Sequence, residues 1–298
     1  MNSAPTGKLR CAITGANGYV GSRLARHFRA RGWEILALTR RTAGIQVGDQ
    51  HVAFELGAPV DACIFASNHI DTLIHCAYDF GPLCWPDCYR INVLGSERLL
   101  RSAREGGVKS IIFLSSISAF EGCSSMYGKA KLQIEAAAAD VEGAIIRSGL
   151  VYGDSETGGM FAALRKAVST AKWVPLVGSG RYPQYLVHEE DLCNVIHEIA
   201  MGRLNYRGPL TAACAQPWPM RELLQELARL QGKEIRFVNI PWRVVWSGLK
   251  LAETIGIGLG FRSDSVLSLV KQNPAPHFDP AMQCRFRRFG TVVACVQG

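Results

Sequence analysis

Tyr127 and Lys131 stand four residues apart, and ten residues separate Tyr127 from the serine pair Ser115 and Ser116. A tyrosine hydroxyl has a pKa near 10, so it exchanges protons at neutral pH only with help from its surroundings. Residues at i and i+4 share one helix face, so Lys131 can sit beside the phenol and favour its charged form. Ser116 can hydrogen-bond a substrate oxygen. This pattern predicts proton transfer at a carbonyl or alcohol oxygen, with Tyr127 as the acid or base.

A glycine turn with the spacing G-x-x-G-x-x-G lies between a β-favouring run, residues 8–14, and a stretch with helical periodicity, residues 22–30. At such a junction glycines allow close approach of a pyrophosphate, and helix N-terminal N–H groups stabilise its charge. An ordinary glycine-rich loop is the alternative for the motif taken alone. The residues predicted to bind a dinucleotide here are Gly15, Asn17, Gly18, Tyr19, Val20 and Gly21.

The next predicted strand, residues 34–39, ends at Thr39 and is followed by Arg40 and Arg41. An NAD enzyme usually presents Asp or Glu here to the ribose 2′-hydroxyl, whereas Arg favours a 2′-phosphate. Two guanidinium groups without a carboxylate therefore predict NADP, with NAD as the alternative. A solvated basic loop is the other interpretation of these residues.

The elements that must position these residues alternate along the chain. Strands are predicted at residues 51–56, 71–77, 109–115 and 143–147, and helices at residues 91–104 and 127–140. The alternation predicts an α/β fold with a doubly wound parallel Rossmann sheet. Ligands of such sheets gather at the C-terminal strand ends. The glycine turn and the serine pair should therefore lie at the same edge.

The length of the chain accommodates one nucleotide-binding domain and a smaller lobe. We expect an NAD(P)-binding Rossmann domain at residues 8–155 and a C-terminal α/β substrate lobe at residues 156–298, with segments returning to the first domain. Within the lobe, the predicted elements are helices at residues 160–171 and 220–231 and a strand at residues 235–240.

Taken together, these motifs resemble the extended short-chain dehydrogenases/reductases, the branch that contains NAD(P)-dependent epimerases, dehydratases and ketoreductases. The similar segments are TGANGYVGSRL, TLIHCA, INVLGSERLL, FLSSISAF, YGKAK, IIRSGLVYG and YLVHEEDL. The resemblance implies that Ser116, Tyr127 and Lys131 are catalytic, with Asn92 in support. It also implies cofactor contacts from Glu55 and Leu56 near the adenine, from His75, Cys76 and Ala77 in the cleft, and from Tyr127 and Lys131.

Two departures from the family pattern bear on the substrate. The loop between Ser116 and Tyr127 is shorter than sugar epimerases typically have, and Gln184 stands where nucleotide-sugar enzymes often carry a diphosphate-binding Arg. Arg181 is the alternative residue for that role. Both departures favour an NADP-dependent ketoreductase or dehydrogenase acting on a sugar-like or small metabolite. The alternatives are a nucleotide-sugar epimerase or dehydratase with retained cofactor, and a non-catalytic dinucleotide-binding sensor or assembly subunit. Relatives of the last kind typically lose the Tyr/Lys pair.

Composition limits the other partners. The net charge of +8 comes from dispersed basic residues, which predicts no nucleic-acid binding, and the ten cysteines show no pairing that predicts a metal site. The N-terminus lacks an apolar signal core, so we expect a cytoplasmic enzyme with a small-molecule substrate; a homodimer is left open. Residues 242–260 are apolar but interrupted by charges, which predicts no membrane span. A core-facing or dimer-facing helix is expected there, with surface membrane binding as the alternative.

Overall fold

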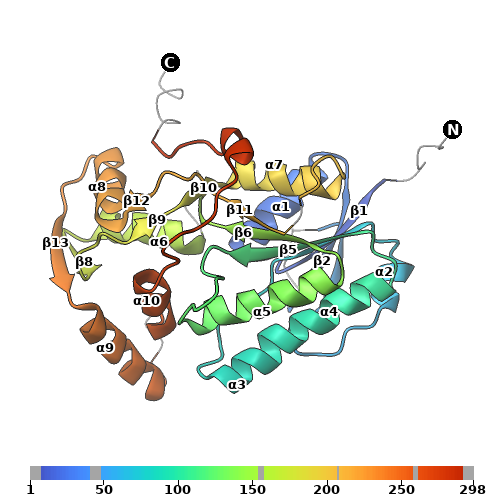
Figure 1. Ribbon diagram of the computed structural model, residues 1–298, viewed down its shortest axis with the longest axis horizontal. Helices are drawn as coiled ribbons and strands as arrows, with labels where there is room; N and C mark the ends of the chain where they lie inside the picture. The colour runs from blue at the N-terminus through green and yellow to red at the C-terminus, as the bar shows by residue number, and fades with distance from the viewer. Residues whose placement is uncertain (1–7, 41–47, 154–157, 207, 258–260, 291–298) are drawn as a thin grey trace. The chain divides into compact units, whose positions relative to one another are not determined.

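The computed structural model describes residues 8–40, 48–153, 158–206, 208–257 and 261–290. The chain folds into two compact units (Figure 1). The first unit contains residues 1–115, 132–147 and 189–210, and the second contains residues 116–131, 148–188 and 211–298. Helix α5 (Met126–Asp140) contributes to both. The domain bounds expected from the sequence, residues 8–155 and 156–298, stay a prediction.

A seven-stranded sheet forms the centre of the first unit, and its pairings from β5 to β3 are all parallel. In spatial order the strands are β11 (Pro209–Ala212), β6 (Ala144–Ser148), β5 (Ser110–Ser116), β4 (Thr72–His75), β1 (Arg10–Thr14), β2 (Glu34–Thr39) and β3 (Gln50–Ala53). After its first residue, each of β1 and β2 is buried along its whole length. Strands covered on both faces require such continuous apolar runs. The predicted Rossmann-like α/β fold is confirmed.

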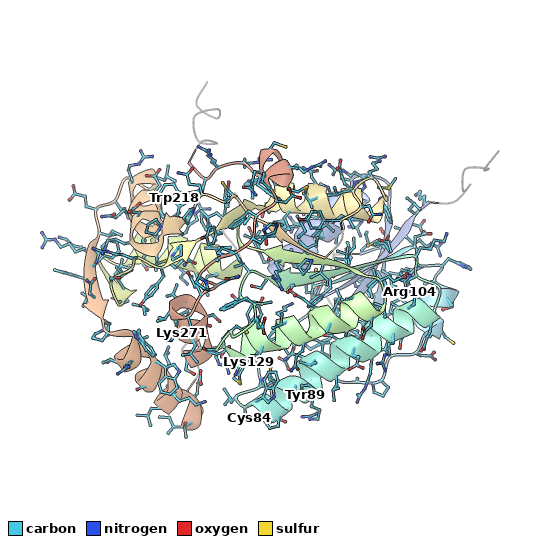
Figure 2. All side chains as sticks on the ribbon, in the orientation of Figure 1. Cys84, Tyr89, Arg104, Lys129, Trp218 and Lys271 are labelled. Carbon is cyan, nitrogen blue, oxygen red and sulfur yellow. The ribbon has the colours of Figure 1, made fainter. Side chains whose placement is uncertain are left out.

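Helices cover both faces of this sheet (Figure 1). On one face α1 (Tyr19–Arg29) packs against α7 (Glu189–Ala200), and on the other lie α4 (Leu94–Glu105) and α5. The remaining helical segments of this unit are α2 (Cys63–Ser67), α3 (Trp85–Cys88) and the π-helical turn η1 (Tyr89–Val93). At the end of α4, Arg104 (Figure 2) donates to the carbonyl oxygens of Val108 at 3.0 Å and Val141 at 3.1 Å. Its side chain thereby ties α4 to the turn after α5.

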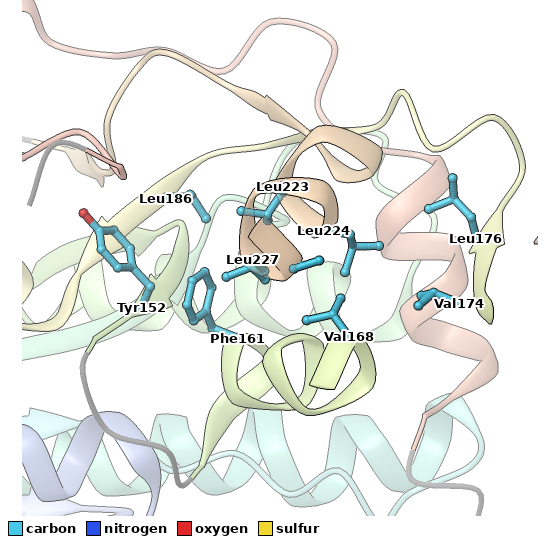
Figure 3. Close-up of a cluster of buried hydrophobic side chains, with 10 residues drawn as sticks. Tyr152, Phe161, Val168, Val174, Leu176, Leu186, Leu223, Leu224 and Leu227 are labelled. Carbon is cyan, nitrogen blue, oxygen red and sulfur yellow. The ribbon is translucent and has the colours of Figure 1, made fainter. Parts of the chain in front are cut away.

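The second unit has its own apolar core (Figure 3). Helices α6 (Gly159–Thr170) and α8 (Met220–Leu230) pack together there with the parallel strands β8 (Trp173–Val177) and β13 (Arg236–Ile240). The buried side chains are Tyr152, Phe161, Val168, Val174, Leu176, Leu186, Leu223, Leu224, Leu227 and Ala228. The other elements are β7 (Leu150–Tyr152), β9 (Pro183–Gln184), β10 (Leu186–His188), β12 (Trp218–Pro219), α9 (Trp242–Thr254), α10 (Ser263–Val270) and the 3₁₀ helix η2 (Pro280–Arg285).

In the part of the chain that the structure describes, every helix falls short of the length and apolar character needed to cross a bilayer.

Two histidines pack in the interface between α1 and α7. The ring centroids of His27 and His197 are 5.8 Å apart, and Phe28 and Trp33 surround them. Among the described residues, nothing forms a hydrogen bond with the buried Nε2 atom of either imidazole. Burial, the Arg31 guanidinium and the neighbouring ring lower the pKa of His27 to about 4. Both histidines are therefore neutral in the fold near neutral pH.

We predict that His27 makes the protein sensitive to acid. The pKa of His27 is lower in the folded than in the unfolded chain. Its contribution to the free energy of unfolding is therefore complete above about pH 6.5 and is lost as pH falls toward 4. After a discount for its partial exposure, protonation should cost about 1–2 kcal/mol. Urea unfolding at pH 7 and pH 4.5 measures this loss, which should be smaller in His27→Gln. The exposed His69→Gln is the control, and equal acid losses in all three proteins would contradict the prediction.

Candidate active site

The glycine turn has the tight backbone that the sequence predicts. Gly15 has φ +67°, and a Cβ on Gly21 would lie 2.2 Å from the Gly15 carbonyl oxygen, so a larger residue cannot replace Gly21 without moving the turn. Helix α1 begins at Tyr19, directly after Gly18, and not near residue 22 as its periodicity suggests. Its first turn has no side-chain cap and no acidic residue. Such a helix start fits the negative charge of a pyrophosphate.

The end of β4 lies against this turn. Thr14 Oγ1 accepts from the backbone N–H of Cys76 at 3.1 Å and of Ala77 at 3.2 Å, and a Cβ on Gly15 would come within 3.0 Å of Ala77. These contacts bring together Cys76, Ala77 and the glycine turn, as expected for residues at one sheet edge. His75 is fully buried. Its Nδ1 atom forms a hydrogen bond with Thr14 Oγ1 at 2.7 Å, and its Nε2 atom forms one with Ser96 Oγ at 2.8 Å. Its imidazole braces β1, β4 and α4.

At the ends of β2 and β3, the predicted adenosine-binding residues differ in exposure. Thr39 is buried, whereas the side chain of Arg40 is 72% exposed and lies 3.9 Å from Asp79 Oδ1. Glu55 is exposed and Leu56 is buried, just past β3. Arg41 lies outside the described residues. Of the two arginines predicted to contact a 2′-phosphate, Arg40 is thus the one that the structure describes.

Ser116, Tyr127 and Lys131 come together in the second unit. Ser116 ends β5, and its side chain interacts with the phenol of Tyr127 and lowers its pKa. Tyr127 lies in the first turn of α5, and Lys131 Nζ is 5.9 Å from the centroid of its ring. The lysine is 3% exposed. A strand end and a helix start thus present a serine hydroxyl, a phenol and an ammonium group to one another.

Burial raises the pKa of Tyr127 above its usual value, and the Ser116 side chain lowers that pKa by a smaller amount. The sequence argument expected Lys131 to favour the phenolate. In the structure, loss of hydration opposes the charged form of Tyr127, and it changes the pKa more than the Ser116 side chain does. Tyr127 is therefore a neutral phenol, which is the form that donates a proton.

Asn92 lies in the π-helical turn η1 and is fully buried. Its Oδ1 accepts from the backbone N–H of Asp79 at 2.7 Å, and its Nδ2 donates to the Asp79 carbonyl at 2.9 Å. This pair of bonds holds the loop after β4. Short π-helical turns occur frequently at functional sites. Asn92 thus binds the backbone of this loop on both sides of the Asp79 peptide.

The structure adds a residue that sequence reasoning did not find. Asp264, at the start of α10, accepts from the backbone N–H of Met126 at 2.7 Å and of Tyr127 at 3.0 Å. Ser125 Oγ accepts from Gly128 N at 3.1 Å. The first turn of α5 is therefore capped by a local serine and by a carboxylate from more than a hundred residues away. The chain shows no local signal for this pairing.

Gly128 explains how the helix comes so near the segment after β5. A Cβ at this position would lie 2.4 Å from the carbonyl oxygen of Ser118. Because only glycine fits, Gly128 lets the first turn of α5, which carries Tyr127, pack against this segment.

A buried ion pair holds the remainder of α5 in the first unit. Glu135 accepts from Arg147 Nε at 2.8 Å and Nη2 at 2.6 Å, and from Ser115 Oγ at 2.6 Å. A bidentate pair of this kind fixes geometry as well as charge. It connects α5, the end of β5 and β6.

Tyr19 and Arg23 have partners in α7. The Tyr19 hydroxyl donates to Glu189 Oε2 at 2.7 Å, and Arg23 Nε donates to the same oxygen at 2.9 Å. Burial and the Glu189 carboxylate raise the pKa of Tyr19. Tyr19 therefore stays a neutral donor that secures the start of α1.

Comparison with known proteins agrees with this geometry. Residues 11–203 match the family model described as "NAD dependent epimerase/dehydratase family". The chain belongs to this family. The resemblance of this chain to the extended short-chain dehydrogenases/reductases is thereby confirmed. The assignment to NAD(P)-dependent enzymes is confirmed as well.

Relatives within and around the family differ in their reactions. Ceramide reductase of Caulobacter vibrioides is 28% identical over 243 residues, which are 77% of this chain and 73% of that protein. Human sterol-4-alpha-carboxylate 3-dehydrogenase, decarboxylating, is 30% identical over 122 residues, 38% of this chain and 31% of that protein. The solved UDP-glucose 4-epimerase of Thermotoga maritima with UDP-glucose is 18% identical, covers 78% of this chain and 86% of its own, and has a TM-score of 0.66. At that identity it shows the shared fold alone.

Metal binding has no support among the described residues, where no three His, Cys, Asp or Glu side chains gather as a ligand set.

We predict that Asp264 stabilises α5. In Asp264→Ala, two N–H groups at the helix start lose their acceptor, and the free energy of unfolding should fall by about 1–2 kcal/mol in urea titrations. Asp279→Ala is the matched control, because Asp279 caps η2 by accepting from Ala281 N at 2.9 Å in an exposed position, so its loss should be smaller. An Asp264→Ala protein as stable as the parent would show that solvent replaces the carboxylate.

Proposed function

We propose that the protein is an NADP-dependent ketoreductase or dehydrogenase that acts on a carbonyl or hydroxyl group of a sugar-like or small metabolite. The observation that carries this proposal is that Ser116, Tyr127 and the buried Lys131 lie together, with the lysine Nζ 5.9 Å from the tyrosine ring centroid. Membership of an NAD-dependent family supplies the cofactor class. The remaining choice concerns the dinucleotide, the substrate and the fate of the hydride.

The catalytic roles follow from the chemistry of the three side chains. Ser116 donates a hydrogen bond to the substrate oxygen and orients it. Tyr127, a neutral phenol, donates its proton to that oxygen as negative charge develops there. Lys131 then stabilises the phenolate that remains, because its ammonium group is close to the ring. Asn92 supports the site through the loop after β4. A bound nicotinamide dinucleotide supplies or accepts the hydride.

The residues proposed to hold the cofactor form three groups. The turn and the start of α1 fit the pyrophosphate, since they combine tight glycines with an uncapped helix start. Tyr127 and Lys131 would contact the nicotinamide end of a bound cofactor, and residues at the ends of β2, β3 and β4 would contact the rest of it. The proposed residues are Gly15, Asn17, Gly18, Tyr19, Val20, Gly21, Thr39, Arg40, Arg41, Glu55, Leu56, Cys76 and Ala77.

Net reduction is favoured over epimerisation by two observations. Ceramide reductase is similar over most of both chains. Gln184 replaces a diphosphate-binding Arg, and its Nε2 donates to the Tyr182 and Pro183 carbonyls, so its amide is engaged with its own strand. A weak diphosphate clamp suits a substrate without a nucleotide. A homodimer and a cytoplasmic location stay predictions.

The test of the function follows NADPH absorbance while keto-sugars and small ketones are screened. We expect stoichiometric loss of NADPH with the true substrate, and loss of turnover by a factor of about 10²–10⁴ or more in Tyr127→Phe, which lacks the proton donor. Dinucleotide binding should survive in that variant, because only a hydroxyl is removed. Lys131→Ala should weaken both activity and binding.

Two outcomes would contradict this assignment. Isomerisation of a nucleotide sugar without net NADPH consumption would make the protein an epimerase. Full activity of Tyr127→Phe would mean that another group transfers the proton.

The cofactor preference is a separate prediction. Arg40 follows β2 between Thr39 and Arg41, with no Asp or Glu beside it in the sequence, so NADP should bind more tightly than NAD, and Arg40→Asp should reverse the order. Calorimetric titration of each dinucleotide measures the two affinities in each protein. Arg98→Asp, at an exposed arginine on α4, makes the same change of charge and is the control that should keep the parental ratio. Equal affinity for both dinucleotides in the parent would remove the argument from Arg40.

A further inference from the structure

The outward face of α9 is apolar and exposed. Val244, Leu251 and Ile255 are 60%, 64% and 62% exposed, and Ile257, just past the helix, is 50% exposed. Gly248 lies between them and has open space where a Cβ would be. The spacing of residues 244, 248, 251 and 255 follows the helical turn, so they form one stripe along the helix. Contiguous apolar surface of this kind marks a site of interaction.

The opposite face of α9 is already occupied, so the stripe is not a core face. The helix packs along α10 (Figure 1). Glu253 turns inward, where its carboxylate accepts from Ser263 N and Oγ, both at 2.8 Å, and from Arg262 Nε at 3.1 Å. The next residue, Asp264, caps the helix that carries Tyr127. These contacts determine which face of α9 points to solvent and tie α9 to the catalytic segment.

The charges along the stripe have one sign. Arg243 and Lys250 are exposed, and their seven-residue separation, two helical turns, puts them on the same flank. The acid of this helix, Glu253, has a side chain only 9% exposed; Lys250 Nζ lies 3.9 Å from it. The outer surface of α9 is therefore an apolar stripe with a basic border.

The strand pair that leads into α9 has the same character. In the register of β8 with β13, Trp173 stands opposite Arg236. Trp173 is 55% exposed, and Arg236 is exposed as well. The guanidinium lies 5.5 Å from the tryptophan ring centroid. Val238 on the same face is 45% exposed. An aromatic ring, an aliphatic side chain and a cation again share one exposed face.

We propose that α9 docks this unit onto an anionic lipid surface, lying in the plane of the interface with its stripe in the apolar boundary. Its length of thirteen residues suits a helix that lies on a bilayer and is too short to cross one. Arg243 and Lys250 then meet acidic headgroups. Docking holds Ser116, Tyr127 and Lys131, which belong to the same unit, at the bilayer.

The charges favour a lipid surface over a second copy of the chain. In a two-fold contact across α9, the stripe and its basic border would meet an identical stripe and border. The chain carries a net charge of +8, so such a contact also gathers like charges. An anionic bilayer supplies both the apolar region and the opposite charge. This proposal does not depend on the reaction assigned above.

The test is flotation of the purified full-length protein with phosphatidylcholine vesicles and with vesicles of phosphatidylcholine and phosphatidylglycerol in equal parts. The parent should float with the anionic vesicles. Leu251→Ser combined with Ile255→Ser should reduce its partitioning at least about tenfold, because two large apolar groups leave the interface. Arg243→Gln combined with Lys250→Gln should reduce binding to anionic vesicles about 20-fold and leave binding to neutral vesicles unchanged.

Matched controls come from α6, where Met160 is 45% exposed and Lys166 is exposed. Met160→Ser and Lys166→Gln should float like the parent. Circular dichroism melts check that all variants are folded, and flotation needs no substrate, so its result is independent of the ketoreductase test. Equal flotation of the parent and the Leu251→Ser/Ile255→Ser variant overturns the proposal. So does a parental dimer that ignores vesicles and dissociates in that variant, as measured by sedimentation velocity.

Discussion

The candidate site depends on how the first turn of α5 is held. Tyr127 and Lys131 both lie near this end of the helix, so the direction of the helix sets where the phenol and the ammonium group point. Asp264 accepts from two of the N–H groups that no helix can satisfy internally, and Ser125 accepts from a third. A carboxylate at this position also complements the helix dipole. The cap therefore contributes both stability and orientation to the residues that carry the chemistry.

Two opposing effects act on the phenol of Tyr127. Burial raises its pKa, so the neutral form is favoured in the free protein. The buried Lys131 ammonium group lies beside the ring, and a nearby cation favours the phenolate. The phenol can therefore give up and regain a proton, as the proposed reaction requires in either direction.

Sequence patterns predicted the parts of the structure that depend on local or periodic signals. β2 has the predicted bounds because its apolar run is buried throughout and is followed at once by arginines. Strands β9 and β12 have two residues each, too few to show a period, and were not foreseen. The start of α1 was placed late, because Gly18 caps the helix without a side-chain signal. Partners distant in sequence, such as Asp264 for Tyr127 and Glu189 for Tyr19, have no local signature at all.

Segment 242–260 shows why periodicity alone could not decide its environment. Apolar residues occur on two sides of α9, so the sequence alone does not tell which of these sides is buried. The structure separates two faces that the sequence presents as equivalent, because Glu253 must reach Ser263 and Arg262 and thereby turns one side inward. Once that side is assigned, the residues left outside are an aliphatic stripe and two cations. A core-facing role is then excluded for the outer face, and the sign of its charges distinguishes an anionic bilayer from a second, equally basic copy of the chain.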